Sequence, residues 1–99
     1  MNIKEYQNKS KTIVDKLDKK FNIKRTPQMS ISQLLEELGE LTEQVNKKNL
    51  RNTKPKKEDL EDEFADVFIQ LGKLASEFNI DLKKAIKNKM KTLKERHKL

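Results

Sequence analysis

The sequence predicts an all-α fold, and three observations support that class. Apolar residues recur every three or four positions, which is the period of an amphipathic helix. Two glycines, two prolines and an aromatic content of 5% leave few of the turns and β-favouring runs that barrels and sandwiches need. A chain of 99 residues forms one domain with a thin core, which subunit contacts would extend. We therefore expect a single domain over residues 1–99, resembling a four-helix bundle and completed by oligomerisation.

The first two expected helices cover about residues 2–22 and 30–48. The first ends before the break at Lys24–Pro27. The second opens near Ser30, whose hydroxyl can cap free backbone N–H groups. The apolar residues that define the first helix are Ile3, Tyr6, Ile13, Val14, Leu17 and Phe21. Those of the second helix are Ile31, Leu34, Leu35, Leu38, Leu41 and Val45.

A basic loop and two further helices are expected in the second half of the chain. Residues 49–57 contain Pro55 and no apolar period, which is typical of a loop. The third helix should begin among Glu58 and Asp59, whose charges suit a helix N-terminus, and end near residue 79. Asp81 is expected to cap the fourth helix. The residues of this helix expected to point inward are Leu82, Ile86, Met90 and Leu93.

The chain is strongly basic, with a net charge of +7 and 39% charged residues. This excess attracts phosphate-bearing partners, but the lysines are spread along the whole chain instead of forming one arm or stripe, so nucleic acid is the less favoured partner. The absence of cysteine excludes disulfides and thiolate zinc sites. No apolar run approaches the roughly 20 residues of a membrane span, and the first residues are polar. We expect a cytoplasmic protein with no membrane partner.

Two pairs of carboxylates border the apolar stripes of the second and third helices. Glu37 and Glu40 lie three residues apart on one flank, and Glu63 and Asp66 repeat that spacing. If the helices pack antiparallel, four carboxylates converge where only a cation or protonation relieves their repulsion. Oxygen ligands favour a hard ion, so we expect Mg²⁺, with Mn²⁺ as a substitute. The alternative is that these are solvated acids paired with the abundant lysines.

Other residues are candidates for roles beside the metal. Glu36 and Asp62 point more outward than the four acids, and either could serve as a general base. Lys89 and Arg96 share one flank of the fourth helix, where two cations could clamp phosphates, although Lys89 could equally cover apolar surface. Gly39 inside a helix costs about 1 kcal/mol relative to Ala, which indicates either close approach of a helix or substrate, or a tolerated glycine.

Two motifs carry a resemblance to a known family. The segments Leu35–Leu41 and Glu63–Val67 resemble the E-E-x-x-E and E-x-x-D signature of MazG-type nucleotide pyrophosphohydrolases, and the similarity extends over about residues 30–97. It implies that Mg²⁺ is held by Glu37, Glu40, Glu63 and Asp66. It also implies an all-α homodimer or homotetramer that hydrolyses an NTP or dNTP to NMP and pyrophosphate, often as a house-cleaning reaction.

The expected function is therefore Mg²⁺-dependent hydrolysis of nucleoside triphosphates. Glu36 or one of the ligand acids would act as the base, while Lys89 and Arg96 would contact the phosphates. Two alternatives remain: a basic helical module that binds nucleic acid, and a regulatory oligomerisation module without catalysis. Neither alternative would depend on the four acids.

Overall fold

The computed structural model describes residues 1–49 and 51–99, and those residues form helices without any strand. The helices are α1 (Ile3–Lys20), α2 (Pro27–Val45), α3 (Lys47–Arg51), α4 (Lys57–Glu77) and α5 (Leu82–His97). The predicted all-α class is confirmed. None of the helices is long and apolar enough to cross a membrane among the residues described.

The start of α2 differs from the sequence prediction. The helix begins at Pro27, and Thr26 caps it by accepting a hydrogen bond from the backbone N–H of Met29. Proline suits the first position of a helix because its missing N–H would have no partner there. The prediction that Ser30 caps this helix is wrong. Ser30 lies one turn inside, where it is fully buried.

The predicted basic loop is also shorter than expected, because the short helix α3 lies within it. The Asp81 cap is confirmed: its side chain accepts a hydrogen bond from the backbone N–H of Lys84. Asn22 and Asn79, just after α1 and α4, both have a left-handed backbone with φ of 55°. Asparagine adopts that conformation more readily than other non-glycine residues, which suits it to the end of a helix.

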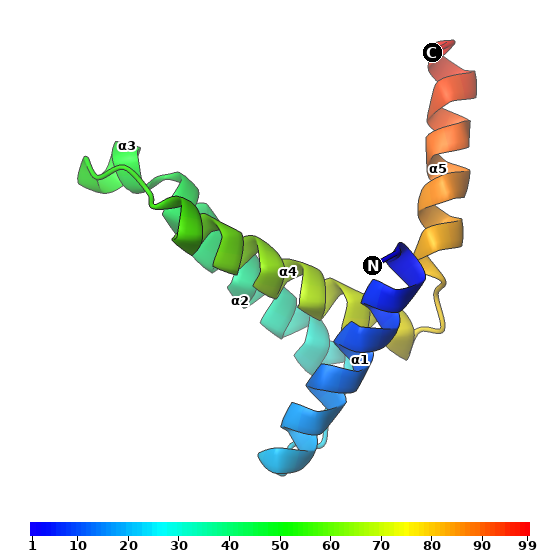
Figure 1. Cartoon of the computed structure of the whole chain (residues 1–99), viewed down its shortest axis with the longest axis horizontal. Helices are drawn as coiled ribbons and strands as arrows, with labels where there is room; N and C mark the ends of the chain where they lie inside the picture. Colours follow the sequence, from blue (N-terminus) through cyan, green and yellow to red (C-terminus); the bar gives the residue numbers. More distant parts are fainter.

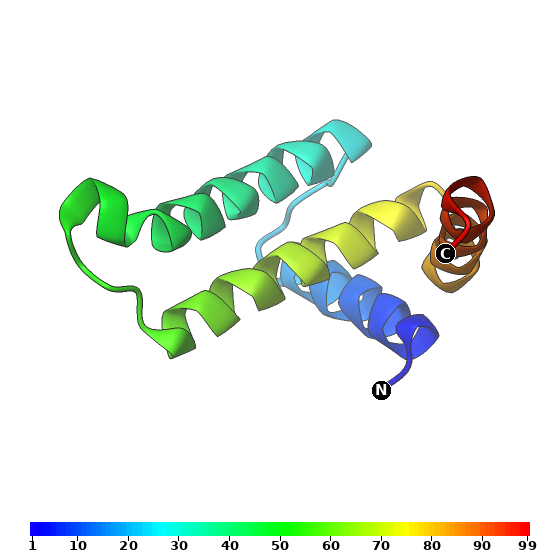
Figure 2. The same ribbon diagram turned by 90° about the horizontal axis from the view of Figure 1, so that it is seen from above.

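α4 is the central helix of the structure. It packs against α2 on one side and α1 on the other, and Figure 2 shows it between these two helices. α2 and α4 run antiparallel because they are joined by the short α3 segment, as Figure 1 shows. α5 contacts α1 and projects away from the α2–α4 pair.

The contact between α1 and α4 is close and partly polar. Val14 of α1 is 1% exposed. A Cβ built on Gly72 would lie 2.9 Å from the Ser10 Cβ, so only glycine allows this approach of the two helices. Lys73 of α4 is buried and donates a hydrogen bond of 2.7 Å to the Asp15 carboxylate. These contacts fix α1 against one face of α4, and the other face of α4 packs against α2.

The expectation that the apolar residues of the last helix point inward is wrong for Ile86 and Met90, whereas Leu82 and Leu93 are half-buried. Ile86 is 37% exposed and Met90 is 59% exposed. The turn before α5 is held by Gln7, whose side chain donates to the Ile80 carbonyl and accepts from the Leu82 N–H. These bonds join the turn to α1, and α5 leads away from the α2–α4 pair (Figure 1). The radius of gyration is accordingly 16.1 Å, against about 13 Å for a compact chain of this length.

Candidate metal centre

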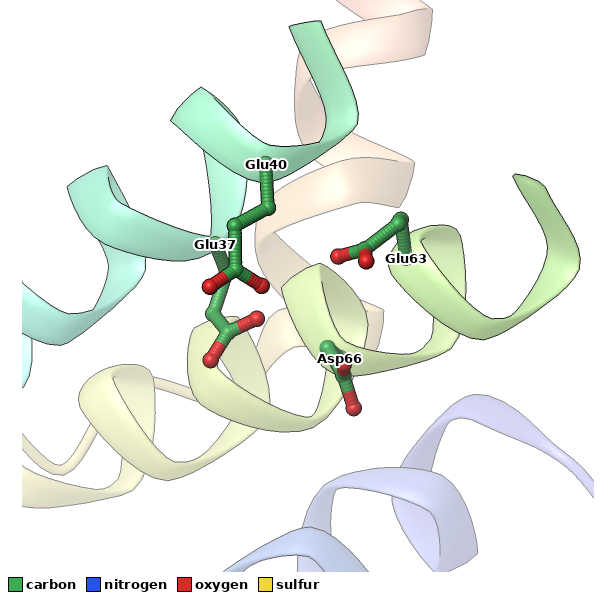
Figure 3. Close-up of side chains that lie close together, drawn as sticks. All are labelled: Glu37, Glu40, Glu63 and Asp66. Carbon is green, nitrogen blue, oxygen red and sulfur yellow. The ribbon is translucent and has the colours of Figure 1, made fainter. Parts of the chain in front are cut away.

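The structure brings together the four acids that the sequence analysis selected. Glu37 and Glu40 come from α2, and Glu63 and Asp66 from α4. One carboxylate oxygen from each residue lies within 4.8 Å of the others, and Figure 3 shows the four side chains meeting between the two helices. Two residues three positions apart lie about one turn apart on a helix, so each helix presents a pair to the other.

A hydrogen bond at one end of the helix pair sets this register. Ser30 of α2 donates to Glu77 of α4, and Arg25 donates to the Ser30 hydroxyl. Moving along α2 from Ser30 leads to Glu37, while moving back along α4 from Glu77 leads to Asp66 and then Glu63. Because the helices are antiparallel, both acidic pairs lie on the α3 side of this contact, 7 and 10 residues from Ser30 and 11 and 14 residues from Glu77. The position of the two acidic pairs relative to each other therefore depends on the contact between Ser30 and Glu77, which are distant in sequence.

The acids perturb one another strongly. Burial, followed by the charges of Asp66 and Glu40, raises the pKa of Glu37 to about 7. The pKa of Glu63 is also raised, first by desolvation and then by the charge of Glu40. The pKa of Asp66 is raised by desolvation and by Asp62 and Glu40. All of these shifts reflect carboxylates brought together with little compensating positive charge.

The donor set fits a hard divalent cation. It consists only of carboxylate oxygens, without the nitrogen or sulfur ligands that favour zinc. One oxygen each of Glu37 and Glu63 is buried and has no hydrogen-bond partner. A cation at this position would neutralise the repulsion and give these oxygens a partner. The chain can therefore hold a divalent metal between α2 and α4.

The other predicted site residues lie elsewhere. Glu36 is exposed on α2, where it lines a hollow of about 350 Å³ together with Arg25, Met29 and neighbouring residues. Lys89 and Arg96 are exposed on α5. The acids lie on α2 and α4, and Figure 1 shows that α5 leads away from this helix pair, so a single chain does not bring these two cations to the acids.

Sequence reasoning missed one feature of the site, which is a pair of polar columns at seven-residue spacing. On α2 the column is Ser30, Glu37 and Gln44; on α4 it is Glu63, Gln70 and Glu77. Seven residues make nearly two full helical turns, so the members of a column share one face. The repeat is visible in the sequence, but only the Ser30–Glu77 contact shows that the two columns face each other.

A comparison with protein families shows the family of this chain. The family model of the MazG nucleotide pyrophosphohydrolase domain matches residues 25–99, which include α2 to α5 and all four acids. The chain belongs to the MazG family. It is therefore a hydrolase that acts on the phosphoanhydride bonds of nucleotides. No curated protein and no solved structure matches this MazG chain.

Proposed function

We propose that this MazG chain is a Mg²⁺-dependent nucleoside triphosphate pyrophosphohydrolase, which converts an NTP or dNTP and water to NMP and pyrophosphate. The observation that carries the proposal is the convergence of Glu37, Glu40, Glu63 and Asp66 within 4.8 Å. The family match supports a nucleotide substrate. Mn²⁺ would substitute for Mg²⁺ because the two ions share a preference for oxygen ligands.

The four acids would hold one or two ions, and the remaining coordination positions would take phosphate oxygens. A bound Mg²⁺ supplies neutralisation of charge on the phosphoryl oxygens and lowers the pKa of a bound water. One of the ligand acids would accept the proton of the water that attacks the α-phosphorus, because Glu36, another candidate base, lines a hollow outside the acidic centre. The bond between this phosphorus and the bridging oxygen then breaks, and pyrophosphate leaves.

Cations at the α3 end of the helix pair would hold the leaving group. Lys54, Lys56 and Lys57 are exposed in the segment that leads into α4. Lys57 lies six residues before Glu63, which corresponds to about 9 Å along the helix axis. A triphosphate bound at the acids would therefore extend toward these lysines.

We further propose that residues 1–99 act as one domain and assemble as a homodimer or homotetramer. Large apolar side chains are exposed on several helices, among them Leu35 at 63%, Phe68 at 52% and Met90 at 59%. A single chain of this size leaves these surfaces uncovered, and a second copy would bury them. Lys89 and Arg96 would then reach the phosphates from the α5 of a second copy, since within one chain α5 leads away.

The direct test is release of pyrophosphate from a panel of canonical and damaged NTPs and dNTPs, with Mg²⁺ or with EDTA. Wild type is expected to produce NMP and pyrophosphate only with the metal. Glu63→Gln should abolish the reaction, whereas Glu61→Gln, which changes an exposed acid on the same helix, should not. Preferential turnover of damaged nucleotides would support a house-cleaning role. No turnover of any nucleotide by folded, metal-loaded wild type would contradict the proposal.

A further inference from the structure

The polar columns of α2 and α4 place two glutamines beside the metal centre in equivalent positions. Gln44 follows Glu40 by four residues, and Gln70 follows Asp66 by four residues. Residues at this spacing are neighbours on a helix, about 6 Å apart along its axis. Each glutamine is also seven residues after the other acid of its helix, Glu37 or Glu63. Both carboxamides therefore lie on the faces where α2 and α4 meet, one on each side of the acids.

These glutamines contain buried oxygens without partners. In the part of the chain that the structure describes, the buried side-chain atoms lacking a hydrogen-bond partner belong to Glu37, Gln44, Glu63, Gln70 and Glu77. All five atoms are oxygens, and all belong to the two columns. Gln70 is only 9% exposed, so its carboxamide is not compensated by bulk solvent. Buried polar groups without partners are rare because each has lost its hydrogen bonds to water without replacement.

The five unpartnered oxygens of the two polar columns are all hydrogen-bond acceptors, so each needs a donor. The neighbouring carboxylates accept hydrogen bonds when ionised and cannot satisfy another acceptor. The cation that these carboxylates fit keeps several water molecules in its shell, and each such water can donate hydrogen bonds. Gln44 and Gln70 each lie about one helical turn from a ligand acid of the same helix.

We propose that Gln70 and Gln44 are positioning residues that accept hydrogen bonds from water molecules bound to the divalent cation. They strengthen metal binding from opposite sides without touching the ion. This inference rests on the metal-dependent function proposed above, and it assigns a role to residues outside the acidic motifs. Partners of this kind around a metal commonly change its affinity by about 10–100-fold.

Another buried glutamine, Gln7, provides a matched control. Gln7 is 8% exposed, but its carboxamide both donates and accepts a hydrogen bond at the turn before α5. Its role is to join α1 to that turn. Replacing Gln7 by Leu should therefore lower thermal stability without changing metal affinity. Replacing Gln70 by Leu should weaken metal binding without lowering thermal stability.

The test is titration of the full chain with Mn²⁺, followed by electron paramagnetic resonance, and thermal unfolding in EDTA. Gln70→Leu is expected to weaken Mn²⁺ binding about 10–100-fold and to raise Tm in EDTA, because it removes an unsatisfied buried group. Gln44→Leu should weaken binding in the same way. Gln70→Glu should retain at least wild-type affinity at pH 8, since a carboxylate also accepts hydrogen bonds from water.

The outcomes separate this inference from the proposed function. If wild type binds Mn²⁺ and Gln70→Leu binds it equally well, the role of Gln70 is overturned while the metal site stands. If Gln70→Glu weakens binding as much as Gln70→Leu, the carboxamide does not act as an acceptor and the inference is also wrong. If wild type does not bind Mn²⁺, the metal-dependent function itself fails, and the role of the glutamines fails with it.

Discussion

Gly72 of α4 lies directly against Ser10 of α1, at a distance that leaves no room for a Cβ. A methyl group at position 72 would lie 2.9 Å from the Ser10 Cβ and 3.2 Å from the Tyr6 ring. The Tyr6 hydroxyl also donates a hydrogen bond to the Phe68 carbonyl of α4. The packing of α1 on the central helix thus depends on one small residue.

Gly72→Ala is expected to destabilise the protein by about 1–3 kcal/mol, because the added methyl group must push α1 away. Urea unfolding followed by circular dichroism would measure this change. Gly39→Ala is the matched control, since nothing lies within 4 Å of a Cβ there. It should stabilise α2 by about 1 kcal/mol, as expected for replacing glycine in a helix. A large loss of stability in Gly39→Ala would mean that this position is not open.

For the buried ion pair between Asp18 and Arg25, removing one partner should destabilise the protein more than removing both. Arg25 donates to both oxygens of Asp18, at 2.7 and 2.9 Å, and both side chains are 11% exposed. Removing only the cation, as in Arg25→Met, leaves a buried charge and should cost about 3–5 kcal/mol. The double variant with Asp18→Leu should recover much of that loss in urea unfolding.

An exposed ion pair provides the comparison for this experiment. Arg51 and Glu43 are 61% and 53% exposed, so Arg51→Met should change the free energy of unfolding by at most about 1 kcal/mol. Equal effects of Arg25→Met and Arg51→Met would contradict the assignment of a structural role to the buried pair.

The raised pKa values of the acidic centre predict an unusual pH dependence without metal. The pKa of Glu37 is about 7, and the pKa values of Glu63 and Asp66 are raised in the same direction. Between the ordinary carboxyl pKa of about 4 and pH 7, the folded chain therefore binds more protons at these groups than the unfolded chain does. The free energy of unfolding should accordingly decrease as pH rises over this interval.

Thermal unfolding between pH 5 and 8, in EDTA and in Mg²⁺, would measure this dependence. Tm in EDTA should fall toward pH 8, and Mg²⁺ should remove the fall, since the cation binds the deprotonated carboxylates. Glu37→Gln should show a weaker fall in EDTA. Identical pH profiles for wild type and Glu37→Gln would contradict the coupling described here.

A mixing experiment can test whether Lys89 acts across subunits. Lys89→Ala and Glu63→Gln should each have low pyrophosphohydrolase activity alone, because one lacks a phosphate-binding cation and the other a metal ligand. If α5 reaches the site of a second copy, a mixed oligomer contains a site that has both residues. Unfolding and refolding the two variants together should then restore part of the activity. If Lys89 acts within its own chain, every mixed site lacks one residue and activity stays low.

Much of the secondary structure could be predicted because its signals are local. Asp81 caps α5 as expected, since its side chain needs only a backbone N–H three residues away. The predicted start of α2 near Ser30 is wrong, although serine is a good capping residue, because Thr26 caps the helix and Pro27 is its first residue. Ser30 instead forms a hydrogen bond with Glu77, which is distant in sequence.

The sequence by itself determined which acids share a helix face, because the spacing of Glu37 and Glu40, and of Glu63 and Asp66, follows from the helical period alone. Only the tertiary structure decided that the two pairs meet, since this depends on the Ser30–Glu77 register and on α4 packing between α1 and α2. The direction of α5 was likewise beyond sequence reasoning. Its apolar stripe is compatible with packing inside one chain, but Gln7 joins the preceding turn to α1, and the helix leads away from α2 and α4 (Figure 1). Local periodicity fixes which side chains share a face, whereas the partner of that face depends on contacts between residues far apart in the chain.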